Sequence, residues 1–192
     1  MGALPADLQR LEEALDAAER DARALVAGLT EARGAWRAEA GSWSVAECLD
    51  HLGTANRIYL GAMQPPAARA LSGRRERRGP AQPGLVGGWF VKFLEPPVKA
   101  RFKTKAPRAI RPRQAPALND AITAFLASQD EVRTFLRTYG DIDLTGVRFP
   151  NPFIRGVRFS LATGLHVIAA HERCHLWQAW RVRQAAERSI AA

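Results

Sequence analysis

The sequence predicts an all-α four-helix bundle that forms one domain over residues 1–192. Four stretches repeat apolar residues every three or four positions, as amphipathic helices do. A long crossover separates the second stretch from the third, and no two segments form a convincing strand pair. The chain has 192 residues and 47% apolar content, so it is long enough to bury a core.

The first predicted helix covers about residues 5–30. Pro5 suits its first turn, because the N–H that proline lacks would have no partner there. The polar run between Gly34 and Gly41 ends the pattern. The apolar positions expected to face the core are Leu4, Leu8, Leu11, Leu15, Ala18, Ala22, Leu25, Val26 and Leu29.

The second predicted helix covers about residues 45–63 and is expected to end before Pro65, because proline disfavours helix in the residue before it. Ser44 and Glu47 have the spacing of a capping box, in which each side chain accepts from the backbone amide of the other. Glu47 also lies one turn before His51. It is therefore a candidate catalytic acid or base, although capping already accounts for it.

A crossover rich in Pro, Gly and basic residues occupies about residues 65–116. Residues 69–113 hold 13 of the 28 Lys and Arg residues and 2 of the 19 Asp and Glu residues. Their net charge is +11, which leaves −2 for the rest of the chain. The crossover can be interpreted as a solvated loop or as a lid that binds an anionic ligand. A short apolar helix around residues 85–94 should pack its Trp and Phe side chains on the bundle.

The third predicted helix has Asn119 as its N-cap and Gly140 as a left-handed C-cap. The segment that follows, residues 141–159, contains Phe-Pro-Asn-Pro-Phe and is too proline-rich for a central strand. Ser160 is a suitable N-cap for the fourth helix, which should run to about residue 186.

Histidines on two helices suggest a metal site. His171 and His175 are four residues apart, so they lie about 40° apart around the fourth helix, one turn above the other. His51 is the third candidate, on the second helix. Three neutral imidazoles would hold a divalent metal and leave a position open for water or substrate. The alternative is that they are ordinary histidines of amphipathic helices.

Other polar residues of the fourth helix lie at different angles to this site. Gln178, seven residues after His171, returns to the same face and would either hold water or substrate or bond to a neighbouring helix. His166 lies about 140° around the axis from His171 and should face another surface or the core. Glu172 and Arg173 are expected to form surface ion pairs.

The composition also limits the cellular setting. No apolar run approaches the roughly 20 residues of a membrane span, so we expect no membrane partner. Acidic residues begin at Asp7, and no signal peptide is visible. Cys48 and Cys174 are far apart in sequence and do not form a disulfide framework. These features predict a reduced, cytoplasmic protein.

Three motifs resemble the DinB/YfiT-like superfamily over about residues 5–185: Trp43-Ser-x-x-Glu47-x-x-x-His51-Leu, then Asn151-Pro-Phe with Ser160-Leu, then His171-Glu-Arg-Cys-His175-Leu-Trp-Gln178. The resemblance implies a four-helix bundle in up-down-down-up order. It also implies a divalent metal, often nickel or zinc, on the positions that match its ligands, His51, His171 and His175. Relatives include thiol S-transferases that use bacillithiol or mycothiol and a mycothiol-dependent maleylpyruvate isomerase, and many members have no assigned reaction.

Two classes of function follow. The leading hypothesis is a metal-dependent enzyme in which the metal activates a low-molecular-weight thiol or water against a small electrophilic substrate, giving S-transfer or hydrolysis. Glu47 and Gln178 would handle protons or support the ligands. The alternative is a bundle that binds a polyanion through residues 69–113, or one that binds metal without catalysis. Nucleic acid is the less favoured partner, because no helix-turn-helix is recognisable. The apolar faces of the first and fourth helices would also suit a homodimer.

Overall fold

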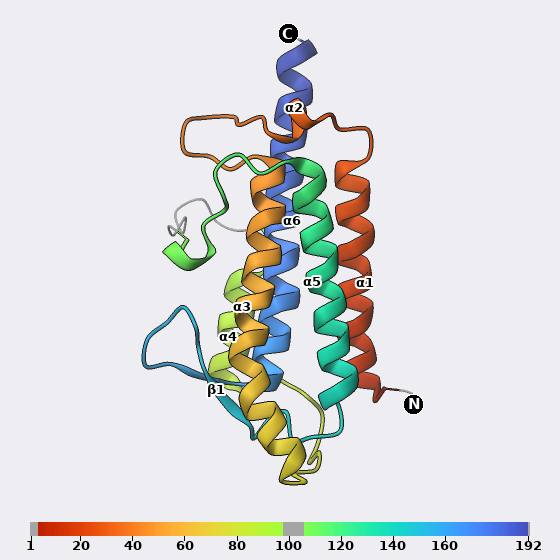
Figure 1. The fold of residues 1–192 in the computed structure, drawn as a ribbon, viewed down its shortest axis with the longest axis vertical. Coiled ribbons are helices and arrows are strands. Elements are labelled where there is room, and N and C mark those ends of the chain that lie inside the picture. The colour runs from red at the N-terminus through yellow and green to blue at the C-terminus, as the bar shows by residue number, and fades with distance from the viewer. Residues whose placement is uncertain (1–3, 98–105, 192) are drawn as a thin grey trace.

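The computed structural model describes residues 4–97 and 106–191, and four long helices pack side by side in it (Figure 1). These helices are α1 (Ala6–Val26), α3 (Val45–Ser72), α5 (Leu118–Tyr139) and α6 (Leu161–Ala191). Both α1 and α3 pack on α5 and on α6, so the four surround a common core. The shorter elements are α2 (Glu31–Gly34), α4 (Leu85–Leu94), the 3-10 turn η2 (Arg108–Ile110), β1 (Arg148–Pro150) and β2 (Arg158–Ser160).

One small hairpin corrects the expectation of no strand pairs. β1 and β2 pair antiparallel, with Phe149 opposite Phe159. Both phenylalanines are buried, while Arg148 and Arg158 point to solvent, so the hairpin packs one face against the bundle. Prolines are tolerated here because a two-stranded hairpin contains only edge strands. The prediction that this segment does not form a central strand therefore agrees with the structure.

Helix α3 continues past the predicted stop, through Pro65 and Pro66, to Ser72. Met63, Ala67 and Ala70 are buried, so the core-facing stripe continues at helical spacing beyond the proline pair. Pro65 is exposed and Pro66 partly so. On this side of the helix, water can satisfy the carbonyls that lose their intrahelical partners.

Neither of the two capping residues predicted for the third helix has the predicted role in α5. The N-cap is Ala117, not Asn119, and the Glu31 carboxylate of α2 accepts from the amides of Leu118 and Asn119, at 2.6 and 3.1 Å. Gly140 has φ −62° and ψ −27°, a right-handed conformation. Its lack of a side chain matters instead for packing, since a Cβ there would lie 2.9 Å from Leu8 Cδ1.

Helices α1 and α6 differ from their predicted ranges by about one turn at their C-terminal ends. α1 ends at Val26, a turn earlier than predicted, and the chain re-enters helix in α2, where Thr30 caps the amide of Arg33. Ser160 caps α6 as predicted, because its hydroxyl accepts from the amide of Thr163 at 3.1 Å. α6 extends to Ala191, a turn beyond the predicted end.

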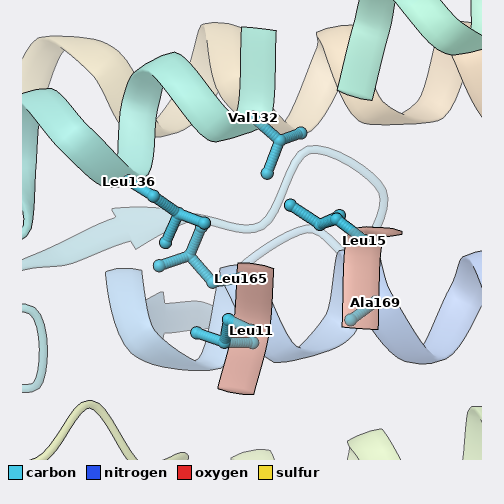
Figure 2. A pocket seen from close by; sticks show the side chains of 6 residues that line it. All are labelled: Leu11, Leu15, Val132, Leu136, Leu165 and Ala169. Atoms are coloured by element: carbon cyan, nitrogen blue, oxygen red, sulfur yellow. The ribbon is translucent and has the colours of Figure 1, made fainter. Parts of the chain in front are cut away.

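The core between α1, α5 and α6 is closely packed. Figure 2 shows six apolar side chains converging there, and the space between them has no room for a water molecule. This region is therefore structural and offers no cavity for a ligand. The six residues are Leu11, Leu15, Val132, Leu136, Leu165 and Ala169.

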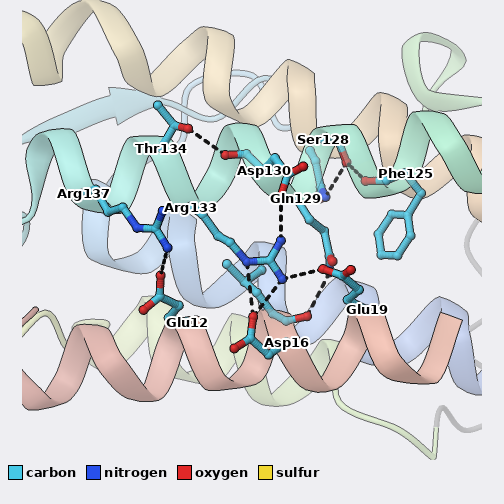
Figure 3. A network of polar contacts seen from close by, with 12 residues as sticks. Glu12, Asp16, Glu19, Phe125, Ser128, Gln129, Asp130, Arg133, Thr134 and Arg137 are labelled. Atoms are coloured by element: carbon cyan, nitrogen blue, oxygen red, sulfur yellow. Dashed lines mark hydrogen bonds and ion pairs between the residues drawn. The ribbon is translucent and has the colours of Figure 1, made fainter. Parts of the chain in front are cut away.

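Ion pairs join α1 to α5 along their outer edge (Figure 3). Arg133 of α5 donates to Asp16 and Glu19 of α1, both at 2.8 Å. Arg137 continues the row by donating to Glu12 at 2.7 Å. These pairs join the two helices, and the Arg133 side chain between the carboxylates is largely buried, at 11% exposed.

The short helix α4 has the predicted bounds and packs on α6. Phe90 contacts Phe159 with ring centroids 5.2 Å apart, as expected for a phenylalanine packed on the bundle. The expectation for its tryptophan is wrong, because Trp89 is 69% exposed. The reason is Gly87, where a Cβ would lie 2.5 Å from Thr163 Oγ1. The helix must turn this face to α6, so Trp89 points away.

The crossover is tied to the bundle at several points, and residues 98–105 of it lie outside the described part. Arg75 bonds Asp143 and Arg77 bonds Asp7, at 3.2 and 2.5 Å, which holds the chain directly after α3. The backbone amide of Ala81 also donates to Asp7, at 2.6 Å. Within the described residues, no helix combines the length and apolar character needed to cross a membrane.

Candidate metal centre

Three histidine side chains converge between α3 and α6. His51 of α3 is 1% exposed, and its Nε2 lies 3.1 Å from Nε2 of His171 on α6. The imidazole centroid of His175, one turn further along α6, lies 4.4 Å from that of His51 and 4.6 Å from that of His171. One ring nitrogen of each residue lies within 4.8 Å of the others. The predicted meeting of these three histidines is confirmed.

Two hydrogen bonds orient the imidazoles. His51 Nδ1 lies 2.5 Å from the carbonyl oxygen of Ile110, which can only accept, so Nδ1 carries the proton. His175 Nδ1 lies 3.0 Å from Gln178 Oε1, which favours the same tautomer. In both residues Nε2 is then the unprotonated nitrogen. Metal-binding histidines have this arrangement, in which a second partner fixes the ring and its tautomer.

The surroundings keep the three imidazoles neutral. Burial lowers the pKa of His51, and it lowers the pKa of His171 well below its ordinary value, with the neighbouring His175 and His51 adding to the effect. Burial, with a smaller contribution from His51, lowers the pKa of His175 to about 3. Neutral imidazoles are the form that binds metal, so no proton has to be removed at neutral pH.

The spacing of these nitrogens fits a shared metal as well as a hydrogen bond between the two imidazoles. Two nitrogens on one tetrahedral ion, each at about 2.0–2.1 Å, lie about 3.3 Å apart, close to the 3.1 Å between Nε2 of His51 and His171. The Ile110 bond leaves a lone pair on His51 Nε2, pointed at its neighbours. A divalent ion would satisfy the lone pairs of all three rings at once.

Trp43 borders the site, whereas Cys48, one turn before His51 on α3, belongs to the apolar core. The Trp43 ring lies 4.7 Å from that of His51 and 5.6 Å from that of His175, so it screens this side from water. Cys48 is fully buried among apolar residues, and burial raises its pKa far above the ordinary value. It is therefore a packed thiol and a poor metal ligand.

Glu47 has the predicted capping role. Its carboxylate accepts from the Ser44 amide at 2.9 Å, while the Ser44 hydroxyl accepts from the Glu47 amide at 3.2 Å. Arg37 donates to both oxygens of the same carboxylate, at 2.8 and 2.6 Å. These bonds fix the start of α3 one turn before His51. A catalytic role for Glu47 stays a prediction, as does one for Gln178.

The crossover takes part in the site through Ile110, which is buried and lies within the basic segment of residues 69–113. Asp50 holds this segment in place, because its carboxylate accepts from the backbone amide of Arg113 at 2.8 Å and from the guanidinium at 2.7 Å. Asp50 and His51 are adjacent on α3, so two consecutive side chains bind the same segment of the crossover, residues 110–113. Nothing in the local sequence signals this role for Ile110, since it acts through a backbone carbonyl.

A buried polar group beside the histidines was missed at the sequence level. Glu172 is not a surface residue: it is 0% exposed, accepts from Asn56 Nδ2 at 2.7 Å and Gln129 Nε2 at 2.9 Å, and burial raises its pKa to about 7. A signal existed, because Gln129 lies between Phe125 and Val132 on the apolar stripe of α5.

The predictions for His166 and Arg173 of α6 agree with the structure. His166 bonds the Ala81 carbonyl at 2.9 Å, away from the triad, and Arg173 pairs with Glu95.

Comparison with known families agrees with this geometry. A model of the DinB superfamily matches residues 14–179, which include the four long helices in large part and all three histidines. No curated protein and no solved structure matches the chain.

Proposed function

The chain belongs to the DinB superfamily, and we propose that it is a metal-dependent enzyme whose ion is held by His51, His171 and His175. The observation that carries this proposal is the convergence of three neutral imidazoles, with ring nitrogens within 4.8 Å of one another. Zinc and nickel are the proposed ions, because imidazole nitrogens suit both. The up-down-down-up order of the family is part of the proposal, and the parallel course of α3 and α5 in Figure 1 supports it.

The chemistry that such an ion supplies is Lewis acidity, which lowers the pKa of a thiol or water beside it and so provides a nucleophile at neutral pH. Three protein ligands leave one position open for that group, as in catalytic rather than structural sites. We therefore propose S-transfer from a low-molecular-weight thiol, or hydrolysis, on a small electrophilic substrate.

The protein's own groups prepare this site in distinct ways. The Ile110 carbonyl and Gln178 Oε1 accept from Nδ1–H of His51 and His175, which leaves Nε2 of each ring unprotonated. Trp43 covers the His51 and His175 rings and limits the access of water. Gln178 is proposed as a supporting residue. For Glu47, the bonds to Ser44 and Arg37 favour a positioning role over proton transfer.

The alternative of a polyanion-binding bundle has less support. Arg75, Arg77 and Arg113 of the basic segment are each paired with a carboxylate of the bundle. This pairing reduces the charge available for the phosphates of a nucleic acid, whose binding depends on free Lys and Arg. A homodimer stays an untested proposal.

The decisive experiment measures metal content and affinity. Protein purified without an affinity tag should bind about one zinc or nickel ion per chain by elemental analysis and calorimetry. His51→Ala and His171→Ala should each lose this tight binding. His166→Ala is the matched control, because this histidine is also on α6 but bonds the Ala81 carbonyl instead of the triad.

The outcomes separate metal binding from catalysis. Unchanged stoichiometry and affinity in His171→Ala would show that the metal site is wrongly assigned. Metal binding without turnover of electrophiles in the presence of bacillithiol, mycothiol or water would support the metal site and refute the proposal that the protein is an enzyme.

A further inference from the structure

The loop that joins β1 to β2 forms a pocket to which the metal centre contributes no residue. The pocket has a volume of about 600 Å³ and is lined by residues 150–153 and 155–158. Its size falls within the range of about 300–1,000 Å³ that is typical of small-molecule sites. The loop projects from the side of the bundle (Figure 1). The Asn151-Pro-Phe motif of the sequence lies in the pocket wall, so this motif has a place in the fold that the three histidines do not explain.

Hydrogen bonds fix the shape of this loop before any ligand arrives. Asn151 is 6% exposed, and its Oδ1 accepts from the backbone amides of Phe153 and Ile154, at 2.8 and 2.9 Å. Its Nδ2 donates to the hydroxyl of Tyr59 on α3 at 3.2 Å. The backbone amide of Asn151 also donates to the Val157 carbonyl at 2.8 Å, which closes the loop. The walls of the pocket are therefore largely preformed, as in most ligand sites.

The charged groups that line the pocket are both cationic. Arg155 and Arg158 line it, and residues 148–160 hold three arginines and no aspartate or glutamate. Arg155 is exposed and forms no hydrogen bond or ion pair with any other residue that the structure describes. Arg158 donates to the backbone carbonyl of Arg148 at 3.3 Å and has no carboxylate partner in the same part of the chain. Both guanidinium groups are therefore available to an anion.

The rest of the lining is mostly apolar. Phe153 packs edge-on against Tyr59, with ring centroids 5.3 Å apart, and remains partly exposed. Pro150, Pro152 and Val157 add further apolar surface. A ligand that combines an apolar body with an anionic group would cover this surface and pair with a guanidinium fork, whose geometry matches carboxylate and phosphate.

We infer that this pocket binds a small organic anion, in which a carboxylate or phosphate is attached to an apolar body. Arg155 pairs with the anionic group, Arg158 adds a second positive charge, and Phe153 contacts the body. The site is separate from the metal centre, because Tyr59, which packs on Phe153, lies eight residues after His51, or about 12 Å along α3. The inference therefore does not depend on a bound ion.

Calorimetry of the intact protein in a metal chelator, with four probes, tests this inference. Phenyl phosphate and phenylacetate each carry an anionic group on an apolar ring. At least one of them should bind with a Kd below about 1 mM, and the tighter of the two identifies the preferred anionic group. Benzyl alcohol and inorganic phosphate should bind at least about tenfold more weakly, because the first lacks the charge and the second lacks the apolar body.

Three variants assign the binding to the pocket. Arg155→Ala should raise the Kd at least about tenfold, because it removes a charge-assisted hydrogen bond. Arg148→Ala is the matched control, since it removes an exposed arginine of the same hairpin that does not line the pocket and keeps the carbonyl that Arg158 contacts. It should change the Kd less than about threefold, because salt screens a more distant charge. His51→Ala should bind the anion as the parent protein does.

Each of the other outcomes overturns the inference. Binding of neither organic anion, or an equal Kd in Arg155→Ala and the parent protein, would show that the pocket is not an anion site. An equal affinity for inorganic phosphate would reduce the pocket to a charged loop without selectivity. Loss of binding in His51→Ala would assign the anion to the histidines, which would leave the proposed metal centre in place while refuting the pocket.

Discussion

Replacing Glu172 by Gln should make the stability of the protein less sensitive to pH. Glu172 is fully buried and accepts hydrogen bonds from two amide groups, and the described residues give it no ion pair. Burial raises its pKa to about 7 from the ordinary 4.5. The folded state therefore keeps a proton that the unfolded chain releases between these pH values, so the free energy of unfolding falls as pH rises through this range and levels off above it.

The size of the effect follows from the shift. Each pKa unit corresponds to about 1.4 kcal/mol, so the change from 4.5 to about 7 makes ionised Glu172 cost about 3 kcal/mol. Glu172→Gln removes this cost, because an amide does not ionise. The variant should match the parent near pH 4.5 and exceed it by about 3 kcal/mol at pH 8. The new amide has acceptors available, because Asn56 Oδ1 and Gln129 Oε1 have no hydrogen-bond partner among the described residues and rotation of either amide brings its oxygen toward the new side chain.

Urea unfolding of both proteins from pH 4.5 to 8, in a metal chelator, measures this difference. Protonation of the histidines changes both curves alike and cancels in the comparison. Glu187→Gln is the control, since Glu187 is an exposed residue of α6 that pairs with Arg183. A difference between Glu172→Gln and the parent that stays constant over the whole range would refute the reasoning.

Three further outcomes are expected. Asp50→Ala should weaken metal binding about tenfold, because it releases Arg113 and with it the Ile110 carbonyl that orients His51. Calorimetry measures the affinity, and a loss no larger than that of the surface variant Asp130→Ala would contradict this. Glu31→Ala should lower the free energy of unfolding by about 1–2 kcal/mol through loss of the α5 cap, measured by urea titration, whereas Glu39→Ala should not. Phe149→Ala should cost about 3–5 kcal/mol by thermal unfolding, because the ring is fully buried, and a cost below about 1 kcal/mol would mean that the hairpin is not packed on the bundle.

The sequence by itself determined the features that depend on neighbours within a few turns. Helical periodicity specified the four long helices, and the Ser44–Glu47 capping box set the start of α3 to the residue. The four-residue step from His171 to His175 placed two imidazoles on one face of α6. These properties come from backbone geometry and local hydrogen bonds, which the order of residues fixes wherever the helix finally packs.

Only the tertiary structure decided the features made by segments far apart in the chain. The cap of α5 comes from Glu31, and the ring of His51 is fixed by a carbonyl 59 residues away. Likewise, α3 passes through Pro65 because its far side is buried, and Glu172 is enclosed by α3 and α5. The burial of a side chain and its contact with a backbone carbonyl depend on which surfaces pack together, so they cannot be predicted from the residue type alone. The histidine spacing therefore suggested a metal site, but packing made it a centre of three oriented, neutral imidazoles.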